Sequence, residues 1–132
     1  MAAIPDKYLD LFTGKKAFAS IATVLKDGSP QVTPVWFDYH GGKIRVNTAR
    51  GRVKARTLRE GAPVALAIID PDNPYRYVQV RGKVTSVTED SSFAHIDSLA
   101  KKYLDADKYP WNQPGDVRIT CEIEPASVQA MG

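Results

Sequence analysis

Apolar and polar residues alternate along two stretches of the chain, as they do in β-strands that bury one face. The apolar face of the stretch 116–124 consists of Val117, Ile119, Cys121 and Ile123. Its other face carries the polar residues Asp116, Arg118, Thr120, Glu122 and Glu124, which we expect to point outward. The stretch Lys43–Thr48 alternates in the same way, with Ile44 and Val46 on its apolar face. The pattern therefore predicts two half-buried strands, with Cys121 as a core residue.

The segment that precedes Lys43 predicts two further strands. Ala17–Leu25 is mostly apolar, and the Asp-Gly pair that follows at Asp27 is a strong hairpin signal. The next strand runs from about Gln31 to Tyr39, and His40-Gly-Gly then turns the chain. We expect these strands and Lys43–Thr48 to form a three-stranded meander. Pro34 cannot donate a ladder hydrogen bond, so its strand is predicted to lie at a sheet edge or beside a local opening.

Two more strands are predicted in the middle of the chain. Pro63–Asp70 is continuously apolar, which is typical of a strand buried on both faces. A long strand is expected from Tyr75 to about Thr88, but its apolar residues change parity between Val84 and Val87. This change predicts a β-bulge near Gly82 or Ser86.

Helical periodicity is confined to short segments. Ile4–Phe12 predicts a short helix that stops at Gly14, and Ser91–Leu104 predicts the longest helix. The latter carries an apolar stripe, expected to cover the sheet, made of Phe93, Ile96, Leu99, Ala100, Tyr103 and Leu104. About six strands and two or three short helices predict a mainly β protein, an antiparallel closed or half-open barrel, with residues 1–132 forming a single domain.

Composition narrows the class of protein without naming its function. The chain is 43% hydrophobic and 25% charged, with a net charge of +3 and no apolar run as long as a membrane span. Its single cysteine excludes an intramolecular disulfide and fits a cytoplasmic location. Its two histidines, His40 and His95, argue against a structural zinc site, and we predict no metal site.

A basic stretch follows the segment Lys43–Thr48. Half of the ten residues 50–59 are basic: Arg50, Arg52, Lys54, Arg56 and Arg59. Gly51 predicts a turn, and a helix is expected from about Arg52 to Gly61. Free backbone N–H groups at a helix start, together with these cations, would favour a phosphate. The alternative interpretation is a solvated basic helix face.

No set of residues in the sequence makes a self-sufficient active site. The glycine-rich phosphate loops and the nucleophile elbow of serine hydrolases are absent from the sequence. His95 fits a packing or surface role, and the carboxylates at turns fit helix and turn capping. If the protein is an enzyme, a bound cofactor is therefore expected to carry the reaction. Aromatic residues near loops could wall a flat ring: Trp36, Tyr75, Tyr77, Tyr109 and Trp111.

Five segments, in this order, resemble the split β-barrel flavin and deazaflavin oxidoreductases, the pyridoxamine 5'-phosphate oxidase-like family. They are Thr33–Phe37, Asn47-Thr48, Arg50–Lys54, Pro71–Val78 and Val80–Gly82. Within this family the chain is most similar to the branch that uses coenzyme F420, and the resemblance covers residues 18–128. It implies a split β-barrel and a homodimer with cofactor sites at the subunit interface.

The resemblance also implies roles for individual residues. The ring of the cofactor would lie along the segment Thr33, Pro34, Val35 and Trp36. Asn47 and Thr48 would lie near the ring or the ribityl chain. Arg52 and Lys54 would hold the phosphate, with Arg56 as a further candidate for the phosphate or the acidic tail. Tyr77 falls where the family places a residue near the ring.

The resulting hypothesis is an F420-dependent reductase that passes a hydride to an unsaturated organic acceptor, with no catalytic side chain assigned. A non-catalytic F420 carrier, an FMN-dependent oxidoreductase and a heme-linked relative are the alternatives within the fold. A nucleic-acid-binding barrel ranks last because the cations cluster at one helix start instead of following a groove. The chain also lacks the C-terminal Arg and His segment of pyridoxamine phosphate oxidases proper, so we do not expect pyridoxal phosphate synthesis.

Overall fold

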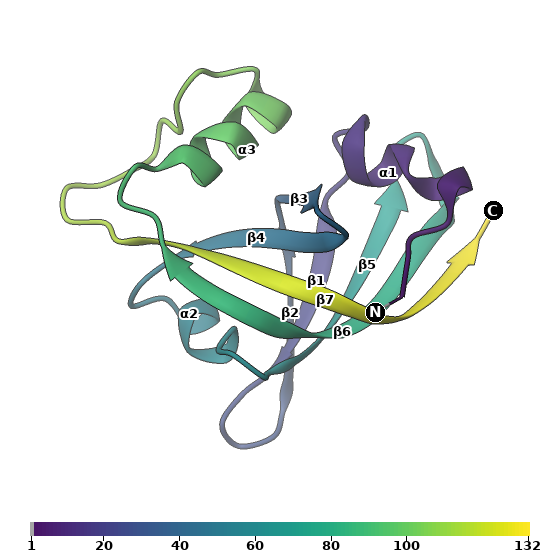
Figure 1. Ribbon diagram of the computed structural model, residues 1–132, viewed down its shortest axis with the longest axis horizontal. Coiled ribbons are helices and arrows are strands. Elements are labelled where there is room, and N and C mark those ends of the chain that lie inside the picture. Colours follow the sequence, from purple (N-terminus) through teal and green to yellow (C-terminus); the bar gives the residue numbers. More distant parts are fainter. Residues whose placement is uncertain (1) are drawn as a thin grey trace.

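The computed structural model describes residues 2–132 and consists mainly of one strongly curled antiparallel sheet (Figure 1). In chain order its elements are the 3-10 helix η1 (Asp6–Tyr8), α1 (Asp10–Thr13), β1 (Ala19–Val24), β2 (Pro30–Val35), β3 (Phe37–His40), β4 (Lys43–Ala49), α2 (Val53–Thr57), β5 (Pro63–Asp70), β6 (Asn73–Glu89), α3 (Ala94–Leu104) and β7 (Arg118–Met131). The fold class is thus mainly β with small helices, as the sequence predicts. None of the helices in the described part of the chain is long and apolar enough to cross a membrane.

The order of the strands explains why the sheet curls. Seven strands lie in the order β2-β1-β5-β6-β7-β4-β3, so that β2 and β3 are the two edges. These edge strands are separated in sequence only by Trp36. Because one residue cannot span an open seven-stranded sheet, the sheet has to bend until its edges approach each other. The result is a half-open barrel, closed by chain continuity and not by a hydrogen-bonded ladder.

The predicted three-stranded meander is wrong for this reason. The expected strand Gln31–Tyr39 is two strands, β2 and β3, which pair with β1 and β4 at opposite edges. At the break, Tyr103 Oη accepts the N–H of Phe37 at 3.3 Å, and Lys102 Nζ donates to the carbonyl of Phe37 at 2.8 Å. Contacts with α3 thus replace ladder bonds there. The edge position predicted for Pro34 is confirmed, since β2 has a partner on one side only.

β5 occupies its predicted bounds but buries only one face. Val64, Leu66 and Ile68 point into the barrel, whereas Ala65 and Ala67 are half-buried and Ile69 is 44% exposed. The prediction of burial on both faces is therefore wrong for this chain alone. The apolar run marks a strand whose second face is only partly covered by the same molecule.

The two longest strands, β6 and β7, pair along most of their length in the barrel. Their register shifts between Arg81 and Gly82 and again between Val84 and Ser86, which confirms the predicted bulge. β7 is also longer than the stretch 116–124, because it continues to Met131 and pairs with β6 as far as Tyr77. The shifts bend both strands across the whole sheet, as the green and yellow ribbons of Figure 1 show.

The helices are shorter than predicted. The N-terminal segment divides into η1 and α1, with Gly14 as the helix C-cap, and α2 contains only five residues. α3 starts at Ala94 and buries Ile96, Leu99 and Tyr103, whereas Leu104 at its end is 41% exposed. These three buried residues form a cluster with Trp36, Phe93 and Tyr109, so that α3 covers the break between β2 and β3. Its His95 also reaches the sheet at Asp38, Asn47 and Thr120.

The main core fills the barrel and extends to the N-terminal helices. Phe12 packs edge-to-face on Phe37 at 5.6 Å between ring centroids. Arg76 on β6 links α1 to β5, because its guanidinium contacts Asp10 at 2.6 Å and Asp70 at 2.9 Å. Cys121 is fully buried, and burial raises the pKa of its thiol to about 11. The prediction that Cys121 is a core residue is confirmed.

Candidate functional site

A cavity of about 260 Å³ opens beside the break between β2 and β3. β2, β4, α2, α3, the start of β7 and the loop after α3 all contribute to its wall. The lining residues are Phe18, Pro34, Val35, Trp36, Asn47, Arg52, Lys54, Ile96, Leu99, Tyr109, Trp111 and Arg118. The wall therefore combines aromatic and aliphatic side chains with three cations and one amide.

The structure brings six of the ten predicted cofactor-binding residues to this cavity: Pro34, Val35, Trp36, Asn47, Arg52 and Lys54. The other four lie elsewhere in this chain. Thr48 is buried on the barrel side of β4, and Thr33 lies on β2 beyond the lining residues. Arg56 lines a different hollow, beside the β1–β2 turn. Tyr77 pairs with Met131 near the other end of β6.

The aromatic wall is held in place from behind. The Trp36 ring stacks on Tyr103, with centroids 5.2 Å apart and planes at 6°. Tyr103 Oη donates to the carbonyl of Ala17 at 2.6 Å, and burial raises the pKa of Tyr103 to about 12, so the phenol stays neutral. Tyr109 meets the Trp36 ring edge-on at 5.9 Å. A ring with a fixed orientation suits a flat ligand, because little side-chain entropy remains to be lost on binding.

Two of the cations come from the start of α2. Arg52 is the exposed N-cap, and Lys54 is half-buried in the cavity wall. Burial, and then the neighbouring Arg52, lower the pKa of Lys54. A helix of five residues has a weak dipole, so attraction of an anion depends on these side chains more than on the backbone. The helix start predicted from the sequence is thus present, but the helix is too short for the full backbone contribution.

The third cation, Arg118, was expected to point outward and is instead 3% exposed. Its Nε donates to Asn47 Oδ1 at 2.9 Å, and its guanidinium lies 5.2 Å from the centre of the Tyr109 ring. Burial lowers the pKa of Arg118. The alternation of β7 correctly separates two faces, but it cannot tell that Tyr109, in the loop after α3, covers Arg118 on the second face. The one sequence feature that pointed to a role for Arg118 was its position at the start of a strand.

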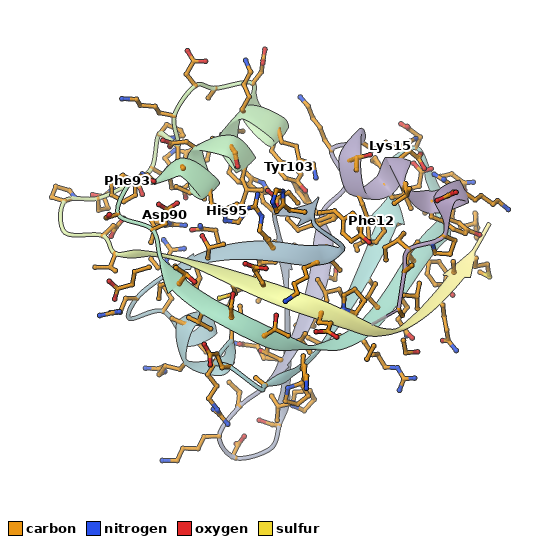
Figure 2. The ribbon with its side chains drawn as sticks, in the orientation of Figure 1. Phe12, Lys15, Asp90, Phe93, His95 and Tyr103 are labelled. Carbon is orange, nitrogen blue, oxygen red and sulfur yellow. The ribbon has the colours of Figure 1, made fainter. Side chains whose placement is uncertain are left out.

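A buried polar network continues from Asn47 away from the cavity. Because Asn47 Oδ1 accepts from Arg118, its Nδ2 faces His95 Nδ1 as a donor at 3.1 Å. In the neutral ring this places the proton on Nε2, which lies 3.3 Å from Asp38 Oδ2 in a contact too poorly aligned for a hydrogen bond. Asp38 in turn binds Arg45 through two bonds of 2.8 Å. Figure 2 shows His95 and Tyr103 extending from α3 toward β3 and β4.

We expect the substitution Asp38→Asn to destabilise the protein by about 2 kcal/mol at neutral pH. Burial alone would raise the pKa of Asp38, but His95 and Arg45 outweigh it and hold the pKa at about 2, below the ordinary 3.8. A lowered folded-state pKa stabilises the fold above the unfolded-state pKa and loses this effect as the pH falls. The difference from wild type should therefore be full above about pH 5 and vanish toward pH 2.

Urea unfolding from pH 2 to 7 measures this effect, with substitution of the exposed Asp107 by Asn as the matched control. A destabilisation of Asp38→Asn that stays constant across this range would contradict the assignment of its pKa.

The cavity is equipped for binding more than for acid–base chemistry. Within residues 2–132, its titratable lining groups are Arg52, Lys54, Tyr109 and Arg118, and no carboxylate, histidine or cysteine lines it. A flat apolar wall next to cations fits a planar ring that carries an anionic group.

Comparison with known proteins places the fold in a family. Residues 4–131 match the family model described as pyridoxamine 5'-phosphate oxidase. A solved structure named F420 reductase is 33% identical, with a TM-score of 0.82, and the match covers 96% of this chain and 98% of that one. A conserved hypothetical protein from Mycobacterium tuberculosis is 21% identical over 98% of this chain and 85% of its own, with a TM-score of 0.74.

A third solved structure, a heme storage protein from Vibrio cholerae, is 16% identical with a TM-score of 0.68, and the match covers 96% of this chain and 94% of that one. At these identities the second and third structures support the fold alone. The family match spans nearly the whole chain, and the F420 reductase supports it at the level of sequence. The chain therefore belongs to the pyridoxamine 5'-phosphate oxidase-like family of split β-barrels.

Proposed function

We propose that this protein is an F420-dependent reductase. When bound in reduced form, F420 would supply a hydride to an unsaturated organic acceptor. The observation that carries the proposal is one cavity in which a fixed aromatic wall at Trp36 lies next to the cations Arg52 and Lys54. A relative of 33% identity that is named F420 reductase favours F420 over other ring cofactors.

Each predicted residue has a proposed task in this function. Arg52 and Lys54 bind the phosphate, because charge-assisted bonds to phosphate oxygens are among the strongest in proteins. Pro34, Val35 and Trp36 support the ring and exclude water, and Asn47 orients its polar edge. We assign no side chain as proton donor to the acceptor.

The remaining assignments depend on parts of the site beyond this cavity. Thr33 is still proposed to lie along the cofactor ring, and Thr48 near the ring or the ribityl chain. Arg56 is the proposed contact for an acidic tail, since it lines a neighbouring hollow with Lys26 and Arg59. Tyr77 lies near the start of β6, whereas the cavity is on the side of the barrel where β6 ends at Glu89. In the proposed complex, Tyr77 can therefore approach the ring only from a second copy of the chain.

A homodimer is part of the proposal. The cavity of about 260 Å³ is smaller than the roughly 300–1,000 Å³ of pockets that enclose a small ligand, so a second protomer would have to complete it. Apolar side chains lie exposed on β2 and β5, with Val32 65% and Ile69 44% accessible. Such residues favour a protein partner on this side of the barrel. We also propose a cytoplasmic location, where the single cysteine stays reduced.

Three alternatives share this fold. A carrier that binds F420 without turnover fits a cavity wall whose described residues include no histidine, cysteine or carboxylate. An FMN-dependent oxidoreductase would use the same phosphate and ring contacts. A heme-linked protein of the same fold is the third alternative.

Titration of purified protein with F420 and, separately, with FMN tests the proposal by following the fluorescence of each cofactor. We expect F420 to bind with a Kd in the micromolar range or below, and FMN to bind at least tenfold more weakly. Oxidation of reduced F420 on addition of quinones, enones or tetrapyrroles then distinguishes an enzyme from a carrier. The reverse preference would identify an FMN protein, and binding of neither would overturn the proposed function.

A further inference from the structure

Arg118 is a buried cation that forms no ion pair within residues 2–132, although the carboxylate of Asp116 is near enough to act on its charge. Its guanidinium forms one hydrogen bond, from Nε to Asn47 Oδ1, and Asn47 is a neutral side chain. Its Nη1 atom is buried without a hydrogen-bond partner among residues 2–132. In the same part of the chain, no carboxylate lies within 4 Å of its nitrogens, although the other arginines at depth, Arg45 and Arg76, both have one.

A guanidinium in such surroundings is costly, because removal from water is offset only when the charge is paired and its N–H groups are bonded. The Tyr109 ring, 5.2 Å away, offsets part of this cost through a cation–π contact. This contact still leaves Nη1 of Arg118 without a hydrogen-bond acceptor within residues 2–132. Burial is the largest cause that lowers the pKa of Arg118, and the repulsion by Arg52 lowers it further and exceeds the attraction by Asp116. The site therefore favours any ligand that brings a negative charge.

The position of Arg118 indicates where that charge would lie. Arg118 lines the same cavity as Trp36 and Lys54, but it belongs to the buried wall, whereas Arg52 is exposed. Asn47 fixes the guanidinium, and His95 and Thr120 lie within 3.5 Å of the Asn47 amide nitrogen. A fixed donor presented by a buried wall is typical of a site that recognises one oxygen of a ligand.

We propose that Arg118 is an anion-binding residue, separate from the phosphate cations, that binds an oxyanion on the portion of the ligand deepest in the cavity. Two sources share this chemistry. One is an anionic oxygen on the polar edge of the cofactor ring, and the other is a carboxylate on the hydride acceptor. The assignment of these two sources rests on the proposed function, whereas the anion site itself is argued from the surroundings of Arg118 alone.

The first experiment follows ligand binding in the wild-type protein, and a variant serves only to assign one signal. In the ¹⁵N spectrum the Nε–H signal of Arg118, assigned by its loss in Arg118→Lys, is followed during titration with sodium benzoate, with neutral benzamide of equal shape, and with F420. We expect a saturable shift with benzoate or with F420, and none with benzamide at the same concentration. An Arg118 signal that neither anion moves overturns the proposal.

The second experiment measures Kd in Arg118→Gln, with Arg81→Gln as the matched control, because Arg81 is exposed and lines a different hollow. Weakening of F420 binding by at least tenfold identifies the cofactor as the source of the anion. Unchanged F420 binding with at least tenfold weaker benzoate binding to the F420-loaded protein identifies the acceptor. Changes below twofold for both probes in a folded variant overturn the proposal.

These outcomes separate this inference from the proposed function. If wild-type protein binds no F420 but benzoate moves the Arg118 signal, the anion site stands and the F420 assignment fails. If F420 binds and the Arg118 signal is unaffected by both anions, the F420 assignment stands and the anion site fails.

Discussion

Replacement of both Arg52 and Lys54 by alanine will weaken F420 binding by roughly 100-fold or more. Each side chain lines the cavity and, in the proposed complex, forms a charge-assisted bond to the phosphate. Such bonds contribute about 1.5–3 kcal/mol each, so the loss of two amounts to about 3 kcal/mol at least. Arg52 is exposed and Lys54 half-buried, so the fold should tolerate both changes. Fluorescence titration of the double variant measures the change.

The matched control is the double variant Arg56→Ala/Arg59→Ala. These cations lie on the same short segment but line the hollow next to the β1–β2 turn and not the aromatic cavity. We expect this variant to change the Kd of F420 by less than tenfold, through loss of net charge or of contacts with the tail. An Arg52→Ala/Lys54→Ala protein that melts like wild type and binds F420 with unchanged affinity would remove the phosphate assignment.

Substitution of Gly82 by alanine will destabilise the protein by about 3 kcal/mol or more, or prevent folding. Gly82 lies at the first register shift between β6 and β7, where the two backbones approach closely. A Cβ atom at this position would overlap the carbonyl oxygen of Glu124 and lie 3.3 Å from Cα of Pro125. Both neighbours belong to the backbone of a central strand, so neither can move without breaking the ladder.

Gly14→Ala is the control for this prediction. A Cβ atom there would have Asp10 O as its nearest neighbour, at an ordinary 3.8 Å, and the backbone of Gly14 is right-handed. We expect a change within about 0.5 kcal/mol in its free energy of unfolding. Chemical denaturation of both variants gives the comparison. Equal stability of Gly82→Ala and wild type would mean that β6 and β7 separate more easily at the bulge than their geometry indicates.

Local periodicity predicted the elements well where one side of a strand faces the core. The alternation of β4, the shift of register in β6 and the edge position of Pro34 all follow from rules that act over a few residues. The break at Trp36 does not follow from such local rules, because it depends on the contact of Phe37 with Tyr103, 66 residues away. The separation of β2 and β3 likewise depends on the curl of the whole sheet.

The candidate site shows the same division. Trp36, Asn47, Arg52 and Lys54 were identified from their segments, and the structure brings them to one cavity. The burial of Arg118 was missed, because it depends on Tyr109 in the loop 105–117, whose path no pattern in the sequence fixes. Tyr77 lies outside the cavity of this chain, and its proposed role requires a second copy.

The place of β7 within the sheet has a consequence for the order in which the barrel is made. β7 lies between β6 and β4, and its ladder with β4 joins residues as far apart as Ile44 and Ile123. Contacts roughly 80 residues apart slow folding to about milliseconds or longer, because a large loop must close before they form. β7 is also synthesised after the other six strands. During translation, β4 and β6 therefore leave the ribosome with open edges, and the barrel can form only after the chain as far as Met131 has emerged.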